Sequence, residues 1–288
     1  MSPSDQISRK GKRMETSGIL VQERRAIQKL LLFRVKDKAW QSLRVWGVFI
    51  VLTVIINGTI PFILGADLRI WSSSTAKGIL FYLIVYSVLF LVVPLILAKG
   101  WGRVRQPAFL IPLCLTIVGI ALLWPITRYA VGIIVPLLAY LHRRFDLSEL
   151  CIRSCGWKGD ITGIFLLALF AMLPSLMGES LFLNPGGALL AGANRLFGNL
   201  ASTVENLFYF GFITERLSVK TGKWFTPILV GAMYTLHEMS NPEYWYEGMK
   251  FGFVFVAVVV AASIYLWRRS VVVTWLGDGL GKFLANLF

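Results

Sequence analysis

The sequence predicts an all-α protein, a polytopic transmembrane bundle of eight or nine helices. Of its 288 residues, 56% are hydrophobic and only 15% are charged. The mean hydropathy is +0.68, and the apolar residues fall into long runs bounded by charged residues, Gly or Pro. Soluble domains carry about a quarter charged residues, so this composition excludes an ordinary soluble domain and predicts a multi-pass integral membrane protein.

A basic N-terminal arm, residues 1–44, precedes the first apolar run. It holds eleven of the 29 Lys and Arg residues against four Asp and Glu, which is half of the formal net charge of +14. Such a segment is typical of contact with anionic lipid, so the lipid bilayer is the expected partner and nucleic acid is not. The pattern over Ile19–Trp40 is compatible with an interfacial helix or with a solvated basic linker.

Nine apolar runs follow the arm, and each is a candidate helix. They are Val45–Leu64, Gly78–Ala98, Ala108–Ile126, Tyr129–Leu141, Asp160–Met177, Leu200–Leu217, Trp224–Glu238, Met249–Trp267 and Ser270–Leu287. Because a spanning helix needs about 20 residues, the fourth run is too short to cross alone. The dipeptide Trp124-Pro125 leaves open a single kinked element made of the third and fourth runs, which gives eight crossings in place of nine.

The positions of Lys and Arg predict the orientation of the chain. With a cytoplasmic N-terminus and nine crossings, 23 of the 29 basic residues lie in the arm or in the inner segments around 99–105, 143–158, 216–223 and 268–269. Cytoplasmic loops collect positive charge, so this count favours the nine-crossing path. The predicted organisation is the arm (1–44), N-terminal transmembrane helices (45–144) and a core (145–288).

Four ionisable residues stand out within the apolar runs: Glu205, His237, Asp278 and Lys282. Each costs about 2.5 to 3.5 kcal/mol on insertion, so they mark a candidate site. At a rise of about 1.5 Å per residue, these residues lie about 12 to 20 Å from the inner ends of their helices. The polar residues of three helices are therefore expected at a similar depth in the membrane. The alternatives are an i,i+4 pair of Asp278 with Lys282 and an interfacial role for His237 near its helix end.

A Glu and a His that face one cavity can hold and deprotonate a water molecule, with the Glu as general base. Hydrolysis is therefore the chemistry that Glu205 and His237 favour. No cofactor is expected: the other histidine, His142, lies elsewhere, which excludes a multi-histidine zinc site. A divalent ion held by Glu205, His237 and Asp278 is the minority alternative.

The three cysteines, at positions 114, 151 and 155, form neither a disulfide framework nor a usual zinc spacing. The common motifs of zinc peptidases, serine hydrolases and phosphate-binding loops are absent from the sequence.

Residues 145–288 carry four segments in a characteristic order: Phe145–Arg153, Glu205–Phe212, Met233–His237 and a closing helix after Trp267–Ser270. This order resembles the CPBP family, which comprises CAAX proteases and bacteriocin-processing enzymes. The family pattern is a Glu-Glu-x-x-x-Arg helix, a Phe-x-x-x-His helix and a final His-x-x-x-Asn/Asp helix. The resemblance implies an all-helical intramembrane peptidase of the glutamic type.

Glu205 matches the first Glu of the pattern and His237 the first His, and the resemblance implies that these two activate water. The positions that depart from the pattern are Asn206 for the second Glu, Phe210 for the Arg, Met233 for the Phe, Asp278 for the last His and Lys282 for the Asn. An ionised Asp278 would repel a developing oxyanion, and Lys282 could replace the lost donor.

The sequence is therefore compatible with three alternative functions. The first is an intramembrane peptidase that cleaves a membrane-associated or C-terminally anchored peptide or protein. The second is a catalytically inactive CPBP-like membrane protein that binds peptides or partner proteins. The third is a small transporter with Glu205 and Asp278 as a proton relay, for which the sequence shows no internal repeat.

Overall fold

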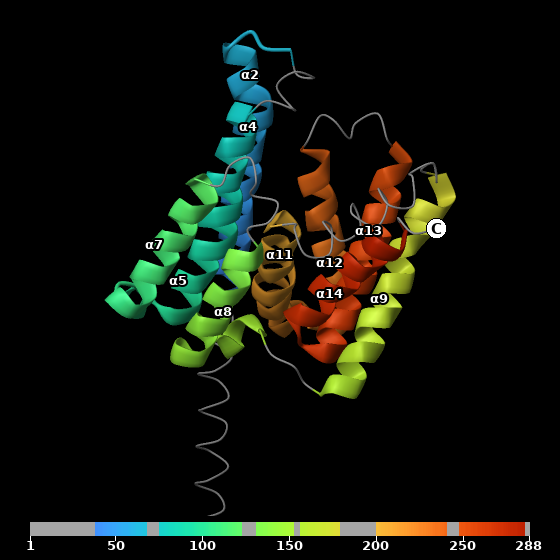
Figure 1. Cartoon of the computed structure of the whole chain (residues 1–288). Coiled ribbons are helices and arrows are strands. Elements are labelled where there is room, and N and C mark those ends of the chain that lie inside the picture. Colours follow the sequence, from blue (N-terminus) through green and yellow to red (C-terminus); the bar gives the residue numbers. More distant parts are fainter. Residues whose placement is uncertain are drawn as a thin grey trace, which may run out of the picture.

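The computed structural model describes residues 38–67, 75–122, 131–152, 156–178, 200–240 and 248–285. Within these ranges every regular element is helical and no strand occurs, which confirms the all-α fold class. Figure 1 shows the helices standing side by side in a bundle. Most of the basic arm, including most of Ile19–Trp40, lies outside the described residues.

The helical segments coincide with the nine apolar runs. The first is Lys38–Ile63, which contains the π-helical η1 (Ile55–Thr59) and ends as α2 (Ile60–Ile63). The N-terminal half continues with α4 (Thr75–Leu80), the π-helical η2 (Phe81–Val92), α5 (Val93–Lys99), α6 (Trp101–Val104), α7 (Pro107–Leu122) and α8 (Val131–Phe145). The C-terminal half contains the 3-10 turn η4 (Leu147–Leu150), α9 (Trp157–Gly178), α11 (Leu200–Asn206), the π-helical η5 (Leu207–Thr214), α12 (Glu215–Met239), α13 (Gly248–Arg268) and α14 (Val271–Ala285).

A sharp bend divides α12 at Gly222, whose φ of 75° and ψ of 169° are not helical. Glycine adopts a positive φ without the steric cost that a Cβ imposes. The bend separates the sixth and seventh apolar runs, as the sequence predicts. The segments α11, η5 and the start of α12 thus form one continuous helical rod. The rest of α12 forms the following rod.

Several of the described turns meet at one end of the bundle. Lys38 pairs with Glu149 at 3.2 Å, and Arg268 pairs with Asp160 at 2.9 Å. The backbone N–H of Val271 donates to the carbonyl of Cys151 at 3.1 Å. These contacts bring together the segments that the sequence analysis groups as inner, where the Lys and Arg residues are concentrated.

The helices α7 and α8 form an antiparallel pair. The ring of Phe109, near the start of α7, lies 5.0 Å from the ring of Phe145, at the end of α8. A single continuous element made of the third and fourth apolar runs is therefore wrong, although Trp124-Pro125 itself lies outside the described residues. This finding removes the reason for preferring eight elements over nine.

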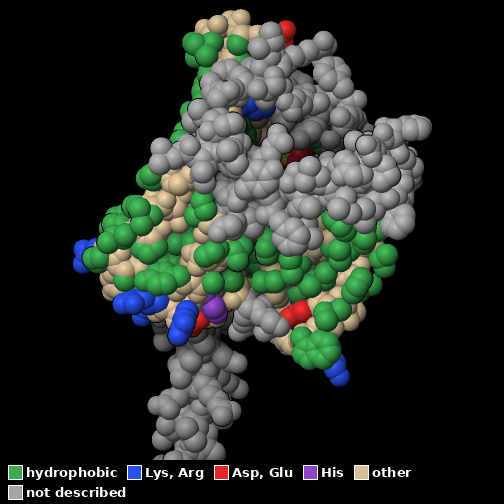
Figure 2. Space-filling view, viewed as in Figure 1, with side chains coloured by type: hydrophobic (Ala, Val, Ile, Leu, Met, Phe, Trp, Pro, Cys, Tyr) green, Lys and Arg blue, Asp and Glu red, His purple; other side chains and the backbone are tan. Residues whose placement is uncertain are grey.

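Two of the described helices, Lys38–Ile63 and Phe251–Arg268, are long and apolar enough to cross a membrane by length and composition. Leu83–Lys99, Pro107–Ile120 and Val271–Gly281 are shorter apolar helices. Figure 2 shows a broad band of hydrophobic side chains on one face, with Lys and Arg mainly along its lower edge. These features support association of the chain with a membrane.

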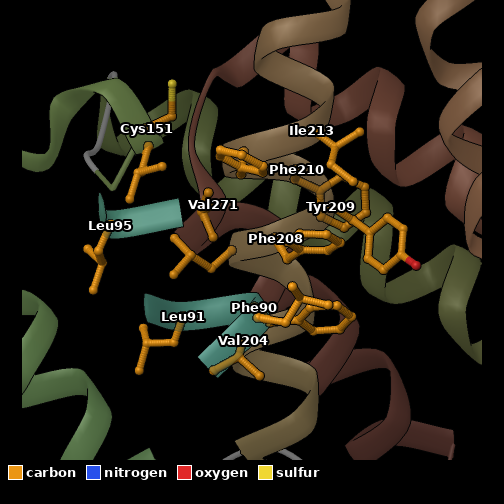
Figure 3. Close-up of a cluster of buried hydrophobic side chains, with 14 of the residues drawn as sticks. Phe90, Leu91, Leu95, Cys151, Val204, Phe208, Tyr209, Phe210, Ile213 and Val271 are labelled. Atoms are coloured by element: carbon orange, nitrogen blue, oxygen red, sulfur yellow. The ribbon is translucent and has the colours of Figure 1, made fainter. Parts of the chain in front are cut away.

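Aromatic rings join the first helix, η2 and η5 in the core. Phe49, Phe90 and Phe208 are fully buried. The rings of Phe90 and Phe208 stack with their centroids 4.1 Å apart, and Phe49 lies 4.9 Å from Phe90. Figure 3 shows Phe90 beside Phe208, with Tyr209 next along the same element. Such pairs add about 0.5 to 1.5 kcal/mol each beyond their buried area, so this cluster fixes η5 against the N-terminal half.

Candidate functional site

Glu205 lies in the last turn of α11, and two tyrosines hold its carboxylate. The Tyr86 hydroxyl, from η2, donates to Oε1 at 3.0 Å, and the Tyr234 hydroxyl, from α12, donates to Oε2 at 3.0 Å. Glu205 is partly buried, and hydrogen bonds to such a carboxyl lower the cost of keeping it away from water. The candidate base is therefore fixed by helices from both halves of the chain.

A cavity of about 90 Å³ lies next to Glu205. Its polar lining consists of Glu205, Asn206, Tyr234, Thr274 and Asp278, and apolar residues of α9, η5 and α13 complete it. One water molecule needs roughly 10 to 15 Å³ of such space and two to four polar partners, so the cavity has room and partners for several. Of the residues predicted from the sequence, Glu205 and Asp278 share this space.

His237 lies in a different environment, one turn along α12 from Tyr234. Its buried ring is surrounded by four aromatic rings, with centroid distances of 4.7 Å to Phe49, 5.5 Å to Tyr234, 5.9 Å to Tyr209 and 6.2 Å to Phe90. Its Nδ1 atom has no hydrogen-bond partner within the described residues. His237 is not among the residues that line the cavity. Tyr234 contacts both His237 and Glu205 and is the link between them.

Lys282 belongs to α14, one helical turn after Asp278, but its side chain lies outside the part of the chain that the structure describes. The roles predicted for Lys282, a partner of Asp278 or a donor to an oxyanion, stay predictions. Within the described ranges no three His, Cys, Asp or Glu side chains are close enough to hold a metal ion. The minority metal set of Glu205, His237 and Asp278 is not assembled in this structure.

Two positions that depart from the CPBP pattern also line the cavity. Asn206, in place of the second Glu, is buried beside Glu205, and Phe210, in place of the Arg, lies one turn further along. The Phe210 ring also lies 6.1 Å from the ring of Tyr265 on α13. Neither Asn206 nor Phe210 adds a formal charge to the wall of the cavity.

The loop that follows α8 lies against η5 and α14. Asp146, at φ 51°, accepts a hydrogen bond from the backbone N–H of Ser148 at 3.1 Å. The Ser148 hydroxyl and backbone N–H hold the pKa of Asp146 below its usual value. A Cβ on Gly211 would lie 2.5 Å from the Leu150 carbonyl oxygen, so the loop can approach η5 this closely only because position 211 is glycine.

The sequence analysis missed the two tyrosines that bind Glu205. Tyr234 precedes His237 by three residues, and this spacing places both on one face of a helix, so the motif held a usable signal. Tyr86 lies 119 residues before Glu205, and no local pattern connects them.

Comparisons with protein-family models, with curated proteins and with solved structures found no match. The site therefore rests on its own geometry.

Proposed function

We propose that the chain is an intramembrane peptidase of the CPBP type, in which Glu205 is the general base. The observation that carries the proposal is the cavity of about 90 Å³ that Glu205 and Asp278 share inside the helical bundle. A carboxylate beside a water-sized space is the minimum that peptide hydrolysis requires of a base. The order of Glu205, His237 and the closing helix supports the assignment to this family.

In the proposed reaction, Glu205 takes a proton from a water molecule in the cavity. The water oxygen then forms a bond to the carbonyl carbon of the scissile peptide, and the proton passes to the leaving nitrogen as the C–N bond breaks. The Tyr234 hydroxyl, which donates to Glu205 at 3.0 Å, orients the carboxylate. Preorganised donors that need not reorient during the reaction contribute most to such catalysis.

His237 takes part through Tyr234 in this proposal. Its ring lies 5.5 Å from the Tyr234 ring, and this contact helps to hold Tyr234 where its hydroxyl donates to Glu205. Lys282 supplies the positive charge for the oxyanion, and Asp278 positions its amine.

The proposed arrangement in the membrane has nine crossings, a cytoplasmic N-terminus and the Lys- and Arg-rich end of the bundle on the cytoplasmic side. The antiparallel pairing of α7 with α8 and the bend at Gly222 support nine. The substrate in this arrangement is a membrane-associated or C-terminally anchored peptide or protein, because the cavity lies among helices that face lipid.

A second candidate is a catalytically inactive CPBP-like protein that binds peptides or partner proteins. Both carboxylate oxygens of Glu205 already accept tyrosine hydroxyls, and aromatic rings enclose His237. A carboxylate and an imidazole held in this way would keep the bundle stable and leave the cavity as a binding site.

A cleavage assay separates the two candidates. The full chain in liposomes is given a library of quenched fluorescent peptides that carry an apolar C-terminal anchor. We expect cleavage by the wild type, loss of cleavage in Glu205→Gln and Lys282→Ala, a smaller loss in Asp278→Ala, and no change in Glu149→Gln, which alters an exposed acid at the bundle end. Equal cleavage by Glu205→Gln and the wild type would exclude Glu205 as the base, and no cleavage by the wild type would favour the binding protein.

A further inference from the structure

A second, larger cavity lies between α8 and α14, away from the one beside Glu205. Its volume is about 230 Å³. Ten residues line it: Val135, Leu138, Ala139, His142, Ile152, Thr203, Leu207, Val271, Val272 and Trp275. Only three of them carry a polar side-chain atom, so the cavity, called the α8–α14 slot below, is almost wholly apolar.

The slot has a buried back and an exposed mouth. Figure 1 shows α11 between α8 and α14, and Thr203 of α11 and Leu207 of η5 form the buried back wall. At the mouth, the side chains of Val135 and Val272 are 39% and 37% exposed. The slot therefore opens sideways from the bundle, in the direction from which lipid chains would enter.

An apolar cavity of this size is an unfavourable place for water, and leaving it empty is also unfavourable. An engineered apolar cavity of about 150 Å³ stays dry and binds benzene, and the walls of an unfilled cavity lose their dispersion contacts. The slot is larger than that and opens on an apolar surface. A hydrocarbon chain is the occupant whose chemistry matches its walls.

One end of the slot leads to positive charge. His142 lines the slot, and the exposed Arg143 and Arg144 follow it at the end of α8. Arg143 lies one turn after Ala139, so it shares the helix face that lines the slot. Further basic residues belong to the same end of the N-terminal half: Lys99, Arg103 and Arg105. The described acids near these cations are Asp146 and Glu149, and Glu149 pairs with Lys38. Asp146 therefore faces the five cations Lys99, Arg103, Arg105, Arg143 and Arg144 among the described residues.

We propose that the α8–α14 slot binds one acyl chain of an anionic phospholipid, with its phosphate at Arg143 and Arg144. Guanidinium groups bind phosphate oxygens in a bidentate geometry, and basic residues close to a membrane surface favour anionic lipid. The lipid comes from the leaflet that faces the Lys- and Arg-rich end of the bundle.

A bound chain would support the walls that also carry the candidate site. On α14, Val271, Val272 and Trp275 line the slot, whereas Thr274 and Asp278 face the cavity beside Glu205. Filling the slot would therefore hold α14 in place against α11. The lipid site does not depend on the proposed peptidase activity, and its test needs no substrate.

The test uses photo-cross-linking of the full chain in nanodiscs. Phosphatidylglycerol and phosphatidylcholine, each with the same diazirine-bearing acyl chain, are compared, and cross-linked peptides are mapped by mass spectrometry. We expect adducts on α8 and α14, with phosphatidylglycerol favoured by about fivefold or more, given the charge of the two arginines. Equal labelling by the two lipids would overturn the proposed headgroup site.

Two pairs of variants locate the site. Val135→Trp fills the mouth of the slot and should abolish the α8 adducts, whereas Val256→Trp, at an exposed valine of α13 that does not line the slot, should retain them. Arg143→Gln with Arg144→Gln should remove the preference for phosphatidylglycerol, and Lys220→Gln with Lys223→Gln should keep it.

Unchanged α8 adducts in Val135→Trp would show lipid around the whole bundle and overturn the slot. Loss of these adducts in both tryptophan variants would overturn it too. If the thermal melt shows that Val135→Trp does not fold, Ala139→Leu blocks the slot with a smaller side chain and the same criteria apply.

Discussion

The two halves of the bundle differ in how closely their helices approach one another. In the C-terminal half, a Cβ added at any of six glycines would lie less than 3.0 Å from an atom of a neighbouring segment: Gly159, Gly163, Gly211, Gly231, Gly277 and Gly281. In the N-terminal half, a Cβ at Gly47, Gly58, Gly65, Gly100 or Gly102 would meet nothing within 4 Å.

The difference shows two ways of holding helices together among apolar surroundings. Lipid is as apolar as the side chains, so helix association in membranes depends on close backbone contact at small residues and on polar links. The C-terminal half has both, whereas the N-terminal half relies on large side chains such as the Phe49–Phe90 pair. The close-packed half also carries Glu205, His237 and Asp278, where a candidate site benefits from rigid support.

The largest effect is expected where α14 packs on α9. A Cβ at Gly281 would lie 2.5 Å from Ala171 Cβ and 2.7 Å from the Ala168 carbonyl oxygen. Gly281→Leu should therefore lower the free energy of unfolding by about 3 kcal/mol, at the upper end of the cost of overpacking. Thermal melts in detergent measure this loss of stability.

The control is Gly58→Leu, which places the same side chain in open space on the first helix. It should melt within experimental error of the wild type or slightly higher, because leucine favours the helix more than glycine does. Equal melting of Gly281→Leu and Gly58→Leu would show that the two halves do not differ in packing.

The ion pair within the C-terminal half differs from the one that joins the two halves. Arg268 binds Asp160 with side chains only 14% and 11% exposed, and it also donates to the Gly156 carbonyl at 3.0 Å. Lys38 and Glu149 are 41% and 42% exposed. Removing one partner of a buried pair costs about 3 to 5 kcal/mol, and because some solvent reaches this pair we expect about 2 kcal/mol for Arg268→Met.

For Lys38→Met the expected loss is below about 0.5 kcal/mol, since exposed pairs contribute little. Both variants are measured by denaturant or thermal unfolding at low and high salt. Comparable losses in the two variants would contradict the assignment of Arg268 as the stronger link.

Much of this fold could be predicted from the sequence, because the information was local. Each apolar run has a helix, and the bend at Gly222 falls between two runs that basic residues separate. The relation of α7 to α8 could not be decided, because it depends on the contact of Phe109 with Phe145, which lie far apart in the chain.

The candidate site could be predicted only in part, for the same reason. Glu205 and Asp278 were found because charged groups in apolar runs stand out, and they share a cavity. The enclosure of His237 depends on rings from four different segments, and helical periodicity gives no information about which helices become neighbours. Tyr86 was missed because a tyrosine in an apolar run carries no signal of its partner.

Tyr86 brings the N-terminal half into contact with Glu205. Tyr86→Phe removes the hydroxyl that donates to Glu205 and should lower the free energy of unfolding by about 1 kcal/mol, the usual net value of a hydrogen bond. Tyr140→Phe, which alters a 41% exposed ring on α8, is the control and should have no measurable effect. If both melt like the wild type, the two halves are not coupled at Glu205.

The smallest effect is expected at the loop that joins the halves, and it depends on pH. The Ser148 hydroxyl and backbone N–H hold the pKa of Asp146 below its usual value of 3.8. A carboxyl whose folded-state pKa is depressed stabilises the protein above its unfolded-state pKa and loses that contribution as the pH falls through the folded-state pKa.

Asp146→Asn keeps the side-chain oxygen and tolerates the φ of 51°, but it does not titrate. The wild type should therefore melt slightly above Asp146→Asn at pH 6, and the difference should shrink as the pH is lowered below about 4. Thermal melts of both proteins across this range measure the difference, and one that grows in acid would contradict the hydrogen bonds of Asp146 with Ser148.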